Sequence, residues 1–203
     1  MKKTIIFLIM LMTYNLWCIN KNAGTTGFSF LKLNFSPRAA AMGYAYAGIA
    51  DDHEAVFYNP AGLYQIDDKK ISAVYMNYIA GINCGALIYT HPVQKNFTMA
   101  MYSKFLSTEE KKTLSDPQGN YLGSQGNFGA SNVEMGISGS YHFSDKINIG
   151  STLKYIYESL DSNSATAFAM DLGIYHITTN DKVHLGIVLR NIGVQLSSYT
   201  SNN

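Results

Sequence analysis

The chain has 203 residues with a formal net charge of +1 at pH 7, and only 14% of its residues are charged although 47% are hydrophobic. Soluble domains average about 25% charged residues, and here polar uncharged residues, together with 15 Tyr and 17 Gly, replace the charges. The scattered Lys and Arg side chains form no basic stripe, which argues against a nucleic-acid-binding surface.

Residues 1–23 have the pattern of a secretory signal peptide. Lys2 and Lys3 precede an unbroken apolar run at residues 5–12, which is much shorter than the roughly 20 apolar residues of a spanning helix. Cleavage is predicted after Cys18 or after Ala23, because no A-x-A triplet marks a single site. Acylation of Cys18, as in a lipoprotein, is disfavoured by the bulky Trp17 that precedes it.

The acidic run D-D-H-E at residues 51–54 predicts the start of a short helix that ends before Pro60. Asp51 or Asp52 suits the N-cap, because carboxylates accept hydrogen bonds from the free N–H groups of a first helical turn. The alternative is a metal or acid/base cluster. The cap is favoured, since no second set of ligands lies nearby in the sequence.

Residues Asn59, Pro60, Ala61 and Gly62 predict a helix stop and a turn. The residue before a proline avoids the helical region, and Gly62 tolerates a positive φ.

Seven segments after residue 69 have strand character, and the clearest ones alternate with period two. Within residues 132–143, one face carries Val133, Met135, Ile137, Tyr141 and Phe143, and the other carries Glu134, Ser138, Ser140 and His142. The segment at 147–157 repeats this pattern, with Ile156 as an apolar exception on the polar face. Segments 167–174 and 183–190 also alternate, whereas 71–79, 82–91 and 97–106 do so less regularly.

The connections between these segments differ in length. Ser144–Lys146 and Thr178–Lys182 suit short periplasmic turns of a membrane barrel, and the polar insert Ser107–Ser131 suits a long extracellular loop. A soluble β-sandwich also alternates, but its strands average about 5 or 6 residues, and these segments are about twice as long. The pattern therefore favours strands that cross a membrane.

Lys154, Asp171 and Arg190 fall on the polar faces of neighbouring segments. Because charges at membrane depth are tolerated only toward a cavity or a partner, they are predicted to face the lumen and to pair across strands. Exposed positions at the rim of the barrel are the alternative.

The chain is expected to be neither an enzyme nor dependent on a metal or cofactor. Its five His residues are scattered, without a Ser, His and Asp order, a phosphate-binding glycine loop or carboxylates at catalytic spacing. Cys18 and Cys84 are its two cysteines, which gives neither a disulfide framework nor a Cys-rich metal site.

A series of motifs between residues 24 and 193 resembles the PorV/PorQ family of outer-membrane proteins, relatives of the FadL-type transporters. These motifs are F-L-K-L at residues 30–33, R-A-A-A-M-G-Y-A from Arg38 through Met42 and Gly43, and the block from Asp51 and Asp52 to N-P-A-G-L at residues 59–63. Residues 154–157, 171–173 and 191–193 complete the match.

The resemblance implies an all-β fold, a FadL-like antiparallel barrel of about fourteen strands with an N-terminal plug. Residues 24–66 would form the plug-like segment, with the N-P-A-G turn at its junction with the barrel, and residues 67–203 would form the strands. Seven strands leave the barrel partial, so a truncated product, a fragment or pairing with a second chain is expected. An eighth strand at residues 28–35 is a disfavoured alternative.

The expected function is passage of hydrophobic solutes across the outer membrane of a diderm bacterium, with outer-membrane lipid as the surrounding partner. One alternative is a component of a protein secretion and surface-attachment system, whose partners would be envelope proteins. The other is a soluble, exported β-sandwich with a binding role.

Overall fold

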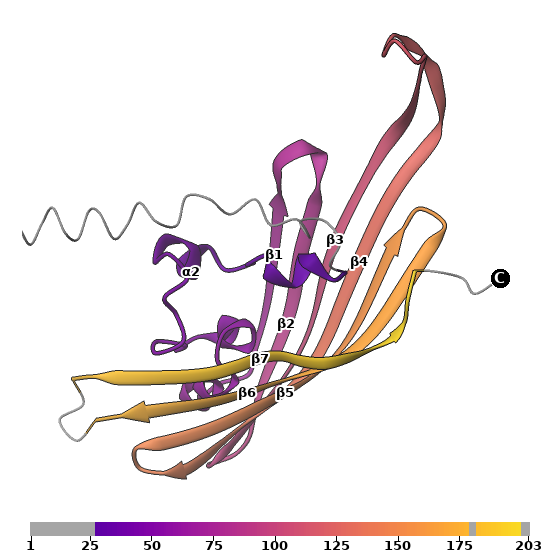
Figure 1. The fold of residues 1–203 in the computed structure, drawn as a ribbon. Coiled ribbons are helices and arrows are strands. Elements are labelled where there is room, and N and C mark those ends of the chain that lie inside the picture. Colours follow the sequence, from indigo (N-terminus) through magenta and orange to yellow (C-terminus); the bar gives the residue numbers. More distant parts are fainter. Residues whose placement is uncertain (1–26, 179–181, 200–203) are drawn as a thin grey trace, which may run out of the picture.

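The computed structural model describes residues 27–178 and 182–199. The predicted signal peptide, including Trp17, Cys18 and both predicted cleavage sites, lies outside these residues. The described chain is all-β, as predicted, and consists of one seven-stranded antiparallel sheet with the order β1-β2-β3-β4-β5-β6-β7 (Figure 1). The strands are β1 (Lys70–Asn77), β2 (Asn83–Gln94), β3 (Phe97–Ser115), β4 (Tyr121–Ser144), β5 (Ile147–Leu160), β6 (Asn163–Ile177) and β7 (His184–Ser197).

Short helices precede the sheet and lie within its curve (Figure 1). They are η1 (Ser29–Lys32), α2 (Pro37–Ala41), η2 (His53–Phe57) and η3 (Pro60–Gln65), and η4 (Ile79–Gly81) joins β1 to β2. We call residues 27–66 the N-terminal segment, and the face of the sheet that it covers the inner face. Residues 28–35 contain η1, so the alternative of an eighth strand there is wrong.

One apolar core lies between the N-terminal segment and the inner face. Ile156, the exception in the alternation of β5, is 1% exposed and belongs to this core, so its position on the polar face of the strand is explained by packing against the segment. Other members are Phe30, Phe35, Tyr46, Val56, Phe57 and Leu63 from the segment, and Ile88, Ala100, Tyr102 and Leu106 from the strands.

The opposite, outer face of the sheet is apolar, and none of the described residues covers it. Large side chains point outward at every second position of the strands, for example Ile137 with 52% and Leu153 with 65% of their surface exposed. Others are Leu87, Tyr89, Met101, Phe105, Met135, Phe168, Leu172, Ile187 and Leu189. The alternation predicted for residues 132–143 and 147–157 is present in β4 and β5.

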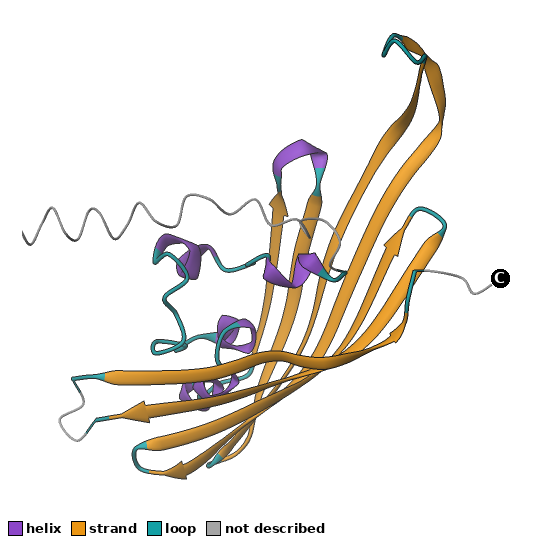
Figure 2. Cartoon of the chain, viewed as in Figure 1, coloured by secondary structure: helices purple, strands orange, loops and turns teal. Residues whose placement is uncertain are grey.

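The expected loop at residues 107–131 is instead a continuation of β3 and β4. The ladder runs from Ser107 opposite Ser131 to Ser115 opposite Tyr121, so that the hairpin extends beyond the neighbouring turns (Figure 2). Its tip is closed by Asp116, whose Oδ1 accepts hydrogen bonds from the backbone N–H groups of Gln118 and Asn120. Backbone pairing thus orders a segment whose polar composition resembles that of a loop.

β1 and β7 form the two edges of the sheet, because each pairs with only one other strand. None of the helices in the described ranges is long and apolar enough to cross a membrane.

Candidate functional site on the inner face

A chain of four buried charges crosses the inner face from β3 to β6. Lys104 Nζ lies 2.6 Å from Glu134 Oε2, and Lys154 Nζ lies 2.5 Å from Asp171 Oδ2. Lys154 Nζ also lies 3.8 Å from Glu134 Oε1, which connects the two pairs. The side chains of all four are at most 6% exposed. Two ammonium groups thus meet two carboxylates, which leaves no net charge in a place where an unpaired charge would be costly.

The four buried charges are connected to β7, the last strand, at a bulge in that strand. Asn191 has a φ of 57°, and the register between β6 and β7 shifts at this point, opposite Asp171. The backbone N–H of Asn191 donates to Asp171 Oδ1 at 2.7 Å, and Lys154 Nζ donates to Asn191 Oδ1 at 2.9 Å. The neighbouring Arg190 donates from Nη1 to the carbonyl oxygen of Phe57 at 2.9 Å, so it contacts the N-terminal segment.

The three charges singled out from the sequence therefore have different roles. Lys154 and Asp171 lie on neighbouring strands and pair, whereas Arg190 bonds a backbone carbonyl. Lys104 and Glu134 were missed as a pair. Glu134 was assigned to the polar face of its segment, but its partner lies 30 positions earlier, and single-sequence alternation does not give the register that brings the two together.

Aromatic rings cover Lys104, at one end of the row of four buried charges. Its Nζ lies 5.1 Å from the ring centroid of Phe57 and 5.6 Å from that of Phe35, both in the N-terminal segment. Tyr102 donates from its hydroxyl to Glu134 Oε1 at 2.5 Å, and its ring meets Phe57 edge-on at 5.2 Å. The rings exclude water from the Lys104–Glu134 pair and offer their π faces to the ammonium.

The N-P-A-G turn attaches the N-terminal segment to the middle strands. Asn59 is fully buried and donates from Nδ2 to the carbonyl oxygens of Ala47, at 2.9 Å, and of Ile174 in β6, at 3.2 Å. Ser140 in β4 donates to the carbonyl oxygen of Ala61 at 2.9 Å. Glycine is needed beneath the turn, because a Cβ on Gly150 would lie 2.3 Å from the nitrogen of Ala61.

The structure corrects two expectations about this turn. Asn59 does not merely follow a helix, because it also caps the next one: its Oδ1 accepts from the N–H of Ala61, and Pro60 begins η3. Gly62 does not take a positive φ. It is required for space, since a Cβ there would lie 2.2 Å from the carbonyl oxygen of Ala50.

Replacing Asn59 by alanine is expected to lower the free energy of unfolding by about 2 kcal/mol. The substitution removes an N-cap and leaves buried carbonyl oxygens without their donor, effects of about 1–2 kcal/mol each that overlap at one site. Chemical denaturation measures the change. Asn127→Ala on the exposed hairpin is the matched control and should change stability by less than about 0.5 kcal/mol; equal effects at both positions would refute the assigned role.

Three of the other motif residues, Arg38, Asp51 and Asp52, form an ionic contact within the N-terminal segment. Arg38 bonds Asp51 at 2.5 Å and Asp52 at 3.1 Å, and Asp51 also accepts from the Tyr46 hydroxyl at 3.0 Å. Asp52 caps η2 through the N–H of Glu54, so the predicted cap is present, although the helix is a 3-10 helix. Met42 packs against the core, and the exposed Gly43 has a φ of 61°.

The Arg38–Asp51 contact predicts a pH dependence of stability. Hydrogen bonding to Arg38 lowers the pKa of Asp51 below its usual value of about 3.9. The stabilisation is therefore complete above that pH and is lost as the pH falls through the lowered pKa. Denaturation of the wild type and of Asp51→Asn should show a wild-type advantage at pH 6 that shrinks below about pH 4. An advantage that stays constant down to pH 2 would contradict this assignment.

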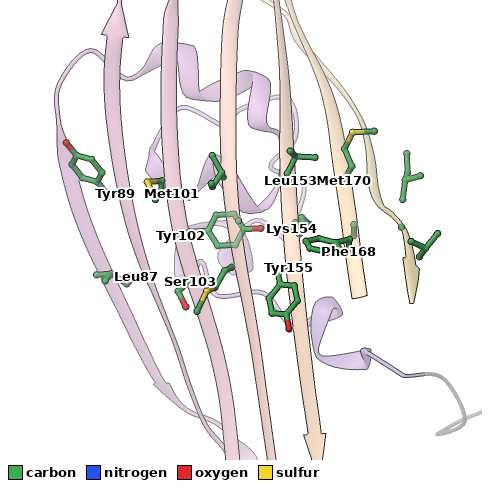
Figure 3. Close-up of a pocket in the computed structure, with 17 residues that line it drawn as sticks. Leu87, Tyr89, Met101, Tyr102, Ser103, Leu153, Lys154, Tyr155, Phe168 and Met170 are labelled. Carbon is green, nitrogen blue, oxygen red and sulfur yellow. The ribbon is translucent and has the colours of Figure 1, made fainter. Parts of the chain in front are cut away.

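The outer face carries an apolar groove of about 1090 Å³ (Figure 3). It lies between two rows of paired residues, one through Leu87, Ser103, Met135, Tyr155 and Phe168 and the other through Tyr89, Met101, Ile137, Leu153 and Met170. A third row of paired residues, which includes Tyr102 and Lys154, lies between these two rows. Its side chains point to the inner face, and its backbone forms the floor of the groove. The groove is thus part of the uncovered apolar face and is separate from the charged inner face.

Within residues 27–178 and 182–199, no group of three or more His, Cys, Asp and Glu side chains is placed to bind a metal ion. Comparison with protein-family models finds no match for the chain, and a search of curated proteins finds no significant match.

Proposed function

We propose that this chain forms part of the wall and the plug of an outer-membrane β-barrel that admits hydrophobic solutes into a diderm bacterium. The observation that carries the proposal is the contrast between the two faces of the sheet. The outer face presents large apolar side chains that no residue of the described ranges covers, as is typical of a surface in contact with hydrocarbon. The inner face buries paired charges beneath the N-terminal segment, where charges at membrane depth are tolerated.

The two open edges require a further part of the wall in this proposal. Unpaired backbone groups in hydrocarbon cost several kcal/mol each, so β1 and β7 pair with additional strands. Six antiparallel steps separate β1 from β7, and the two edge strands therefore run in the same direction. A closure that is antiparallel throughout needs an odd number of added strands, which the same polypeptide or a second chain supplies. The fourteen strands implied by the PorV/PorQ resemblance meet this condition.

The solute-passage role is supported by that same resemblance and by the position of the N-terminal segment over a charged inner wall. Lys154, Asp171 and Arg190 line the lumen in this proposal. A component of a secretion and surface-attachment system has the same architecture, so experiment must separate the two roles.

Fractionation and a deletion strain together test the proposal. We expect the protein in the outer-membrane fraction, resistant to carbonate and released only by detergent, and we expect the deletion to lower uptake of radiolabelled palmitate while surface proteins stay in place. Release by osmotic shock without detergent would favour the soluble β-sandwich. Normal palmitate uptake with loss of surface proteins would instead assign the chain to secretion.

A further inference from the structure

Lys104 contacts both the sheet and the N-terminal segment. On one side its ammonium pairs with Glu134 of the neighbouring strand at 2.6 Å. On the other side it faces the rings of Phe35 and Phe57 at 5.6 and 5.1 Å. Only 6% of the surface of the Lys104 side chain is exposed, so these rings attract the ammonium without competition from water.

The four charges that pair across the inner face are satisfied without the N-terminal segment. Lys104 pairs with Glu134 and Lys154 pairs with Asp171, and all four residues lie on β3 to β6. Asp171 receives its further hydrogen bond from Asn191 of β7. Departure of the segment would therefore break none of these ion pairs, although it would expose apolar side chains of the inner face such as Ile88, Leu106 and Ile156.

The segment also forms ion pairs within itself. Arg38 pairs with Asp51 and Asp52, which belong to the segment itself. Three of the polar contacts that join the segment to the inner face involve backbone carbonyl oxygens: Asn59 donates to that of Ile174, Ser140 to that of Ala61, and Arg190 to that of Phe57. In two others, the backbone N–H of Phe28 donates to the carboxylate of the half-buried Glu158 at 2.5 Å, and the Tyr175 hydroxyl donates to Gln65 Oε1 at 3.3 Å. Water replaces the partner of a carbonyl oxygen at much smaller cost than the partner of a buried charge.

We propose that the N-terminal segment is a displaceable lid over a preformed charged wall, and that Lys104 holds it closed through the rings of Phe35 and Phe57. When the ammonium no longer attracts these rings, opening of the lid becomes easier, while the sheet stays folded and the apolar core still favours the closed state. This inference concerns only the segment and the strands, so it does not depend on the lipid contact of the outer face.

Hydrogen exchange followed by mass spectrometry tests the lid. The double substitution Lys104→Met with Glu134→Gln removes the ammonium and its counter-charge together, so no unpaired charge remains. We expect exchange of the amides of residues 30–63 to rise about tenfold, which corresponds to about 1.4 kcal/mol of lost attraction between ammonium and ring. Exchange in β5 and β6 should change by less than about twofold. If the variant does not fold, Lys104→Gln with Glu134→Gln replaces it.

Two further variants show whether the effect belongs to the cation beneath the rings. Lys104→Arg keeps a cation that stacks on aromatic faces and should leave exchange of the segment near the wild-type rate. Lys154→Met with Asp171→Asn removes the other ion pair, which has no such rings above it among residues 27–178 and 182–199, and should not open the segment selectively. Equal opening in this control, unchanged exchange in the Lys104 double variant, or parallel increases in segment and strands would each overturn the proposal.

Discussion

Replacing Ile137 by lysine is expected to lower the free energy of unfolding by about 2–4 kcal/mol in a lipid bilayer. Ile137 lies in the middle of the part of β4 that pairs with β5, from Ala130 to Ser144, and it projects from the outer face with 52% of its surface exposed. If that face meets hydrocarbon, a lysine there loses its hydration. If the face meets water, the same substitution is an ordinary surface change of less than about 0.5 kcal/mol. Denaturation of the protein in phospholipid vesicles measures the difference.

The matched control is Leu122→Lys. Leu122 is equally apolar and 65% exposed, but it lies near the tip of the β3–β4 hairpin, far from the apolar rows of the outer face. Lysine at this position should be nearly neutral. A loss at Ile137 no larger than the loss at Leu122 would mean that the outer face is not in contact with lipid.

Replacing Glu134 by leucine is expected to cost about 3–5 kcal/mol, the penalty for leaving one member of a buried ion pair alone. Lys154 keeps Asp171 as its partner, but Lys104 loses its only carboxylate among the described residues and stays beneath the rings of Phe35 and Phe57. Chemical denaturation of the variant gives the change in stability.

The companion variant adds Lys104→Met to Glu134→Leu. Because a buried pair replaced by apolar residues is often close to neutral, the double variant should recover most of the stability that the single substitution removes. If instead the second substitution adds its own loss to the first, Lys104 and Glu134 do not act as a pair, and the buried charges lack the assigned role.

The seven antiparallel strands and the sidedness of β4 and β5 were predictable from period-two alternation. Successive side chains of a strand point to opposite faces, so the sequence of one strand shows the composition of both faces. The same pattern isolated Ile156 as an exception. What decides its position is the N-terminal segment, which packs on the inner face more than 90 residues away in sequence. Tertiary packing therefore explains the one residue that breaks the alternation.

The Lys104–Glu134 pair was not predictable, because it depends on how β3 and β4 are aligned. The alignment of the two strands is set by the hairpin at residues 107–131, whose Gly, Ser and Asn content predicts a loop. The pairing within this hairpin is irregular near Lys111 and Leu114. The hydrogen bonds of Asn59 were missed for a related reason. A motif shows that Asn59 precedes a proline, whereas the carbonyl of Ile174 reaches it only through the folded sheet.

Spin labels placed one at a time along residues 149–157 of β5 test most directly whether the outer face meets hydrocarbon. Cys18 and Cys84 are replaced by serine so that each introduced cysteine is labelled alone, and the protein is studied in its membrane. We expect labels at 149, 151, 153, 155 and 157 to be relaxed by oxygen, which concentrates in hydrocarbon, and to be shielded from a water-soluble nickel chelate. Labels at the intervening positions should be shielded from oxygen. Ready access of the nickel chelate at Leu153 and its outward neighbours would contradict the account.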